Sequence, residues 1–145
     1  MTKDLQTARQ LLENGNYTCV LCRDDVTHTS TRRGVAPLLY WLDENTDLRG
    51  FSAADRVVGR ATAYLYHLLG VKEVFARVMS RPAAQVLADY GIPASWETLV
   101  DAIENRQKTG PCPMEYATRN CTTPEEALAA VREALKHLTF QTNSL

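Results

Sequence analysis

The segment from Phe51 to Gly70 constrains the fold more than any other part of the sequence. Ser52 stands where it can cap a helix, and Asp55 follows three residues later as the acid of a capping box. The positions after it are mostly apolar, which is typical of a helix buried on several sides. Gly59 contributes to a strip of small residues that would let this helix approach a sheet closely, and Gly70 is a natural end. The segment therefore predicts a buried central helix.

Strand and helix patterns alternate through the rest of the chain. Asp24 and Asp25 separate two runs rich in strand formers and predict a β-hairpin. Ser80 and Pro82 predict a capped helix start directly after a strand. The expected elements are a helix over 1–15, a hairpin over 17–34, helices over 36–45 and 51–70, a strand over 72–79, a helix over 80–91, a return of the chain near 92–96, and helices over 97–106 and 123–137. This order predicts one α/β domain over residues 1–145, a three-layer α/β/α sandwich with a mixed sheet.

Composition excludes several classes of function. With 45% hydrophobic residues, 23% charged residues and a formal net charge of −1, the chain signals neither disorder nor a nucleic-acid surface. It contains no apolar run of the roughly 20 residues that a membrane span needs, and its first residues do not resemble a signal peptide. We therefore expect a cytoplasmic protein in which the four cysteines are free thiols.

Four stretches carry a resemblance to a known family: RRGVAPLLYWL, ADRVVGRATA, SRPAAQVLADYGI and, most specifically, NRQKTGPCPMEYA. Through them nearly the whole chain resembles the family known as domain of unknown function 1893. The resemblance implies a cytidine-deaminase-like fold and no established activity. Deaminases hold zinc with His and Cys ligands, some of them in a P-C-x-x-C motif, and the matching places here read Ala53-Ala54-Asp55 and Ser80-Arg81-Pro82-Ala83. Because these places lack metal ligands, we expect no zinc and no other cofactor.

Three residues are candidates for catalysis, and each has a simpler structural interpretation. Cys112 lies between two prolines, where a helix start would favour its thiolate, or the segment is only a packed turn. Glu115 lies one helical turn later and is either a base or a helix cap. Asp55 is either a capping-box acid or, if the resemblance holds, a residue at the mouth of a deaminase-like site.

Six further residues are candidates for ligand binding. Ser80 lies where a strand passes into a helix, the edge at which open α/β sheets bind ligands, although capping alone would explain it. The others supply donors or backbone freedom near the candidate catalytic residues. The candidate ligand-binding residues are Arg33, Gly34, Arg56, Ser80, Asn105 and Arg106.

Two functional hypotheses follow from these candidates. The first is a site for a small molecule, nucleotide-like or another anionic metabolite, near Asp55, Ser80 and Cys112, with thiol-dependent catalysis as one form of it. The second is a non-catalytic interaction or scaffold protein on the same fold. Convergence of the candidate side chains on one cavity would favour the first hypothesis, and their dispersal would favour the second.

Overall fold

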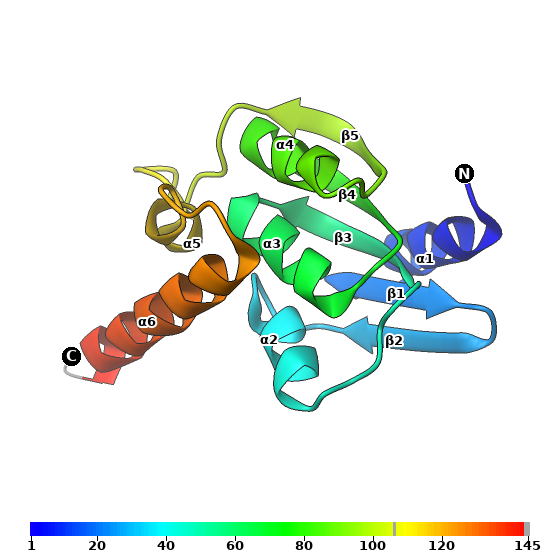
Figure 1. Ribbon diagram of the computed structural model, residues 1–145, viewed down its shortest axis with the longest axis horizontal. Coiled ribbons are helices and arrows are strands. Elements are labelled where there is room, and N and C mark those ends of the chain that lie inside the picture. The colour runs from blue at the N-terminus through cyan, green and yellow to red at the C-terminus, as the bar shows by residue number, and fades with distance from the viewer. Residues whose placement is uncertain (106, 144–145) are drawn as a thin grey trace.

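A five-stranded mixed sheet organises the computed structural model, which describes residues 1–105 and 107–143 (Figure 1). The strand order is β2-β1-β3-β4-β5. The strand β1 pairs antiparallel with β2 and β3, whereas β3, β4 and β5 run parallel. The strands are β1 (Cys19–Arg23), β2 (Val26–Ser30), β3 (Ser52–Val58), β4 (Glu73–Ser80) and β5 (Ala94–Val100). The helices are α1 (Lys3–Asn14), α2 (Ala36–Asp43), α3 (Arg60–Leu69), α4 (Arg81–Asp89), α5 (Pro113–Ala117) and α6 (Pro124–Asn143).

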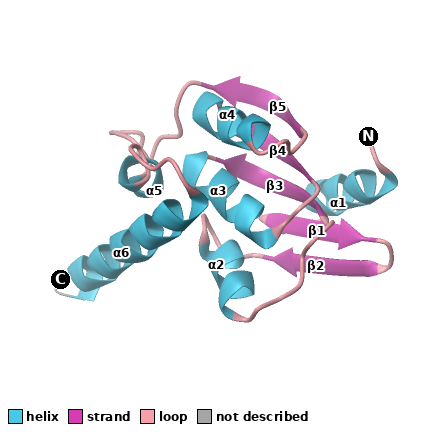
Figure 2. Ribbon diagram, in the orientation of Figure 1, coloured by secondary structure: helices cyan, strands magenta, loops and turns pink. Residues whose placement is uncertain are grey.

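Helices cover both faces of the sheet, as the predicted three-layer sandwich requires (Figure 2). The helix α1 packs on one face, where Leu12 meets Val20 and Phe75 in a small apolar cluster. The helices α2, α3, α4 and α6 contribute to the larger cluster on the other face. Cys19 belongs to the larger cluster and Cys22 to the smaller one, so the two thiols lie on opposite faces of β1, as residues three apart on a strand do.

The prediction of one helix over 51–70 is wrong. The segment forms the strand β3, then a break at Gly59, and then α3, which ends at Gly70 with a φ of 77°. A strand covered on both faces and a buried helix both read as continuous apolar runs, so periodicity does not separate them. Ser52 and Asp55 therefore lie on a strand, and Asp55 is not a capping-box acid.

The prediction of a helix over 97–106 is also wrong, because residues 94–100 form the edge strand β5. The hairpin, the strand near 72–79 and the other helices are confirmed. Ser80 caps α4 as predicted, since its hydroxyl accepts the N–H of Ala83 at 3.2 Å. No helix in the described part of the chain combines the length and apolar character needed to cross a membrane.

Candidate functional site

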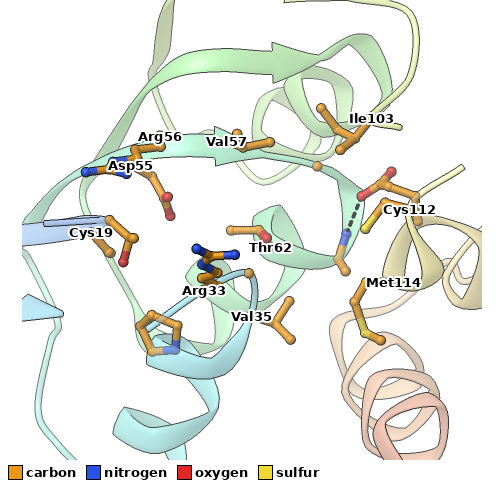
Figure 3. A pocket seen from close by; sticks show the side chains of 16 residues that line it. Cys19, Arg33, Val35, Asp55, Arg56, Val57, Thr62, Ile103, Cys112 and Met114 are labelled. Atoms are coloured by element: carbon orange, nitrogen blue, oxygen red, sulfur yellow. Dashed lines mark hydrogen bonds between the residues drawn. The ribbon is translucent and has the colours of Figure 1, made fainter. Parts of the chain in front are cut away.

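A cavity of about 290 Å³ opens at the carboxyl end of β3 (Figure 3). It lies between the start of β1, the segment that leads into α2, the first turn of α3, and a wall formed by Ile103, Cys112, Met114 and Glu115. The carboxyl ends of parallel strands are where α/β sheets usually bind ligands. The topology therefore gathers side chains from four separate parts of the sequence around this cavity.

A buried hydrogen-bonded chain forms one side of the cavity. Cys19 and Asp55 are direct partners across β1 and β3. The hydroxyl of Tyr66, on α3, donates to the Asp55 Oδ2 at 2.6 Å and lies 3.0 Å from the Cys19 Sγ. With the Tyr66 proton directed to Asp55, the Cys19 thiol has two acceptors within reach, the Tyr66 oxygen and the Asp55 carboxylate.

Burial sets the protonation of this chain. The Asp55 side chain is only 6% exposed, and desolvation raises its pKa to about 6 although Tyr66 and backbone N–H groups stabilise the charged form. Burial, and then the nearby Asp55 charge, raises the pKa of both Cys19 and Tyr66. Asp55 is therefore the group of this chain that exchanges a proton near neutral pH.

Glu115 forms the opposite side of the cavity and caps a helix other than its own. Its Oε1 accepts the backbone N–H of Ala61, in the first turn of α3, at 3.3 Å. Gly59 makes this contact possible, because a Cβ at that position would lie 2.0 Å from the same oxygen. Burial raises the pKa of Glu115, and the Ala61 N–H and the Arg60 charge oppose that rise. The predicted capping role is thus real, but it is directed to α3.

Cys112 lies beside Glu115 on the same wall. It precedes Pro113 at the start of α5, is half-buried, and lines the cavity together with Met114 and Ile103. Its backbone N–H donates to the Ile103 carbonyl at 3.0 Å, which ties the start of α5 to the preceding loop. Among the candidate residues it is the one that presents a nucleophilic atom to the cavity.

Arg33, Gly34 and Arg56, three of the candidate ligand-binding residues, also line the cavity. Figure 3 shows the Arg33 side chain reaching into the middle of the cavity, between Asp55 and Thr62. Neither Arg33 nor Arg56 has a carboxylate partner within the described residues. Arg33 and Arg56 therefore bring two guanidinium groups without ion-pair partners among the described residues to a cavity that the carboxyl groups of Asp55 and Glu115 also line.

Thr62 was missed by the sequence analysis. It is the third residue of α3, is 7% exposed and lines the cavity, and its hydroxyl has no hydrogen-bond partner in the described part of the chain. In the predicted helix over 51–70, Thr62 lies in the middle of the helix, where a threonine gives no indication of a ligand-binding position. The break at Gly59 places it in the first turn of α3, where backbone N–H groups have no partner within the helix.

Comparison with known proteins identifies the family from residues 7–135, which match the model described as domain of unknown function, DUF1893. The chain belongs to the DUF1893 family. The crystal structure of a DUF1893 family protein from Thermotoga maritima superposes with a TM-score of 0.83 at 21% sequence identity, covering 92% of this chain and 91% of that one. At this identity the similarity establishes the fold. No curated protein matches the chain.

Two of the remaining candidates in this DUF1893 chain lie away from the cavity lining. Ser80 is fully buried and occupied as the cap of α4. Asn105 is bound to Thr109, both side chain to side chain at 3.1 Å and through the Thr109 N–H at 3.0 Å, which closes a loop. Arg106 lies outside the described residues.

The donor set of the site does not suit a metal ion. Across residues 1–105 and 107–143, no three His, Cys, Asp or Glu side chains gather closely enough to hold one. The side chains that face the cavity from opposite walls are occupied with protein hydrogen-bond partners, as for Asp55 with Tyr66 and Glu115 with Ala61. The tetrahedral site that zinc chemistry needs has no counterpart among these residues.

Proposed function

We propose that the protein binds a small organic molecule in the cavity beside Asp55, Cys112 and Glu115. The observation that carries this proposal is convergence: candidates from residues 33–34, 55–56 and 112–115 line one space of about 290 Å³. Ligand pockets typically begin near 300 Å³, so this space suits a small ligand. An interaction or scaffold protein would not need these polar groups to meet in a concave site.

A second form of this function is thiol-dependent chemistry, which Cys112 favours. The half-buried thiol faces the same space as two carboxyl groups whose pKa values burial raises. In such a reaction the thiol gives its proton to a carboxylate and its sulfur bonds to an electrophilic carbonyl carbon, whose π electrons move to the oxygen. Ligand binding alone requires no such step.

We also infer that the scaffold is related to that of the cytidine deaminases. The element order of helix, hairpin, helix and then alternating strands and helices supports this relation, as does the mixed sheet. The helix that follows the third strand begins at Gly59-Arg60-Ala61, and this corrects the comparison with Ala53-Ala54-Asp55. Neither stretch supplies a His or Cys, so the proposed function excludes zinc-dependent deamination on the basis of the donor set.

A thermal-shift screen of small metabolites tests the proposal. A ligand present at a hundred times its dissociation constant stabilises the folded chain by about 2.7 kcal/mol, which corresponds to a melting temperature higher by roughly 5–10 °C. A ligand in the cavity must also slow alkylation of Cys112 by iodoacetamide. Cys121 is the matched control, because it is likewise partly buried but lies outside the cavity lining. Stabilising ligands that leave the Cys112 rate unchanged would contradict binding at this site.

A further inference from the structure

The hydrogen bonds around the cavity divide its polar groups into occupied acceptors and free donors. Both carboxyl groups already accept a hydrogen bond from the chain, Asp55 from Tyr66 and Glu115 from Ala61. The guanidinium of Arg33 and the hydroxyl of Thr62, in contrast, have no partner within the described residues. The two donor groups without partners favour a ligand that supplies acceptor atoms and negative charge.

Thr62 marks where those acceptor atoms would lie. The first turn of a helix presents free backbone N–H groups and a partial positive charge, which together attract anions. Thr62 belongs to the first turn of the ten-residue helix α3, and its side chain is more than nine-tenths buried. No side-chain oxygen that is closed off from solvent lacks a partner among the described residues, so the Thr62 hydroxyl opens onto the cavity, where a ligand atom can accept its hydrogen bond.

Glu115 occupies part of the same helix start. Its Oε1 lies over Gly59 and accepts the Ala61 N–H, so a carboxylate of the chain already uses one of the first-turn donors. The charge of Arg60 acts on this carboxylate, and the ionisable groups of Arg33, Asp55, Arg56, Cys19 and Cys112 line the same cavity. A second anion on the adjacent Thr62 donors would experience repulsion from Glu115.

We propose that the ligand carries an oxyanion, a carboxylate or a phosphate-type group, that is bound by Arg33, Thr62 and the first turn of α3 in competition with Glu115. This inference rests on the proposed function and names the chemistry of its ligand. Arg33 supplies the charge, Thr62 supplies the orienting hydroxyl, and the Glu115 carboxylate lowers the affinity until it withdraws from the helix start or is neutralised.

Amide NMR titration of the full chain tests the proposal with two probes, sodium sulfate for a tetrahedral anion and sodium acetate for a carboxylate, at matched ionic strength. We expect saturable shifts of the Ala61 and Thr62 amides with at least one probe. Arg33→Gln and Thr62→Val should weaken binding at least fivefold. Arg32→Gln is the matched control, because that guanidinium lies over the Tyr40 ring at 4.7 Å and outside the cavity lining.

Glu115→Gln tests the competition separately, because glutamine retains an acceptor oxygen for Ala61 and removes the charge. We expect it to bind the preferred probe about fivefold more tightly than the wild type. Equal or weaker binding would overturn the competition. Shifts that do not saturate, or that survive both Arg33→Gln and Thr62→Val, would overturn the oxyanion subsite.

The thermal-shift screen separates this inference from the function on which it rests. A neutral or cationic ligand that protects Cys112 from alkylation, together with no response to sulfate or acetate, would retain the binding function and refute the oxyanion subsite. Absence of any ligand and of any anion response would refute both.

Discussion

Gly59→Ala is the sharpest test of how the candidate site is built. The backbone at this position has φ of −102° and ψ of −175°, which alanine adopts without strain. The added Cβ would instead lie 2.0 Å from the Glu115 Oε1. The carboxylate would have to withdraw by roughly 1.5 Å to reach an ordinary contact distance, and its 3.3 Å hydrogen bond to Ala61 would break.

The magnitude follows from the groups involved. A hydrogen bond to a charged group contributes about 1.5–3 kcal/mol, and part of this returns when the displaced carboxylate is hydrated. Replacing glycine also restricts the unfolded chain, which stabilises by about 0.4–1 kcal/mol. We therefore expect Gly59→Ala to lower the free energy of unfolding by about 1–2 kcal/mol and the melting temperature by roughly 2–8 °C.

Urea denaturation of a double-mutant cycle measures this directly. In the Glu115→Ala background there is no carboxylate to displace, so only the restriction of the unfolded chain remains and Gly59→Ala should stabilise by about 0.4–1 kcal/mol. Gly110→Ala is the matched control, because no atom lies within 4 Å of its added Cβ. An equal loss from Gly59→Ala in both backgrounds would refute the argument that this glycine admits Glu115.

Three other predictions concern the walls of the cavity. Burial raises the pKa of Asp55 from 3.8 to about 6, so the folded state binds this proton more tightly; its stabilising contribution is full below about pH 4 and is lost as the pH rises through 6. Between pH 4 and pH 6 the free energy of unfolding of the wild type, measured by urea titration, should fall by about 3 kcal/mol relative to that of Asp55→Asn. Asp101→Asn is the control, because its side chain is 93% exposed, and it should show the same pH dependence of stability as the wild type. Tyr66→Phe removes the donor to Asp55 and should cost about 1.5–3 kcal/mol, and an unchanged unfolding midpoint would contradict that bond. Cys112 should react with iodoacetamide faster than Cys121, whose pKa is raised by burial, and peptide mapping that shows equal rates would contradict this.

Elements with local signals were predictable from the sequence. The turn at Asp24 has a φ of 52°, which aspartate tolerates and which suits the hairpin. The Ser80 cap and Pro82 mark the start of α4, and Gly70 ends α3 in the left-handed conformation. Each signal acts within a few residues, so it can be recognised without the rest of the fold.

In the segment 51–70, local sequence signals did not distinguish a strand from a helix. Residues Ser52–Asp55 are buried on both faces of the sheet, so the alternation that identifies a strand is absent. The edge strand β5 was missed for a different reason: Leu99 lies four residues before Ile103, and this spacing was interpreted as one face of a helix. In both places the pairing partners that decide the conformation lie far along the chain.

The candidate site depends on the same long-range pairing. Asp55 was interpreted either as a capping acid or, through the family resemblance, as a residue at the mouth of the site, but its place in the cavity comes from its register opposite Cys19. Thr62 carried no signal because the helix start at Gly59 was hidden within an apolar run. Gly59 had been interpreted as a position where the helix packs closely against a sheet. In the structure, the space that a Cβ at Gly59 would fill is occupied by the Glu115 carboxylate. One unrecognised break therefore concealed both the strand that positions the acid and the helix start that positions the free donors.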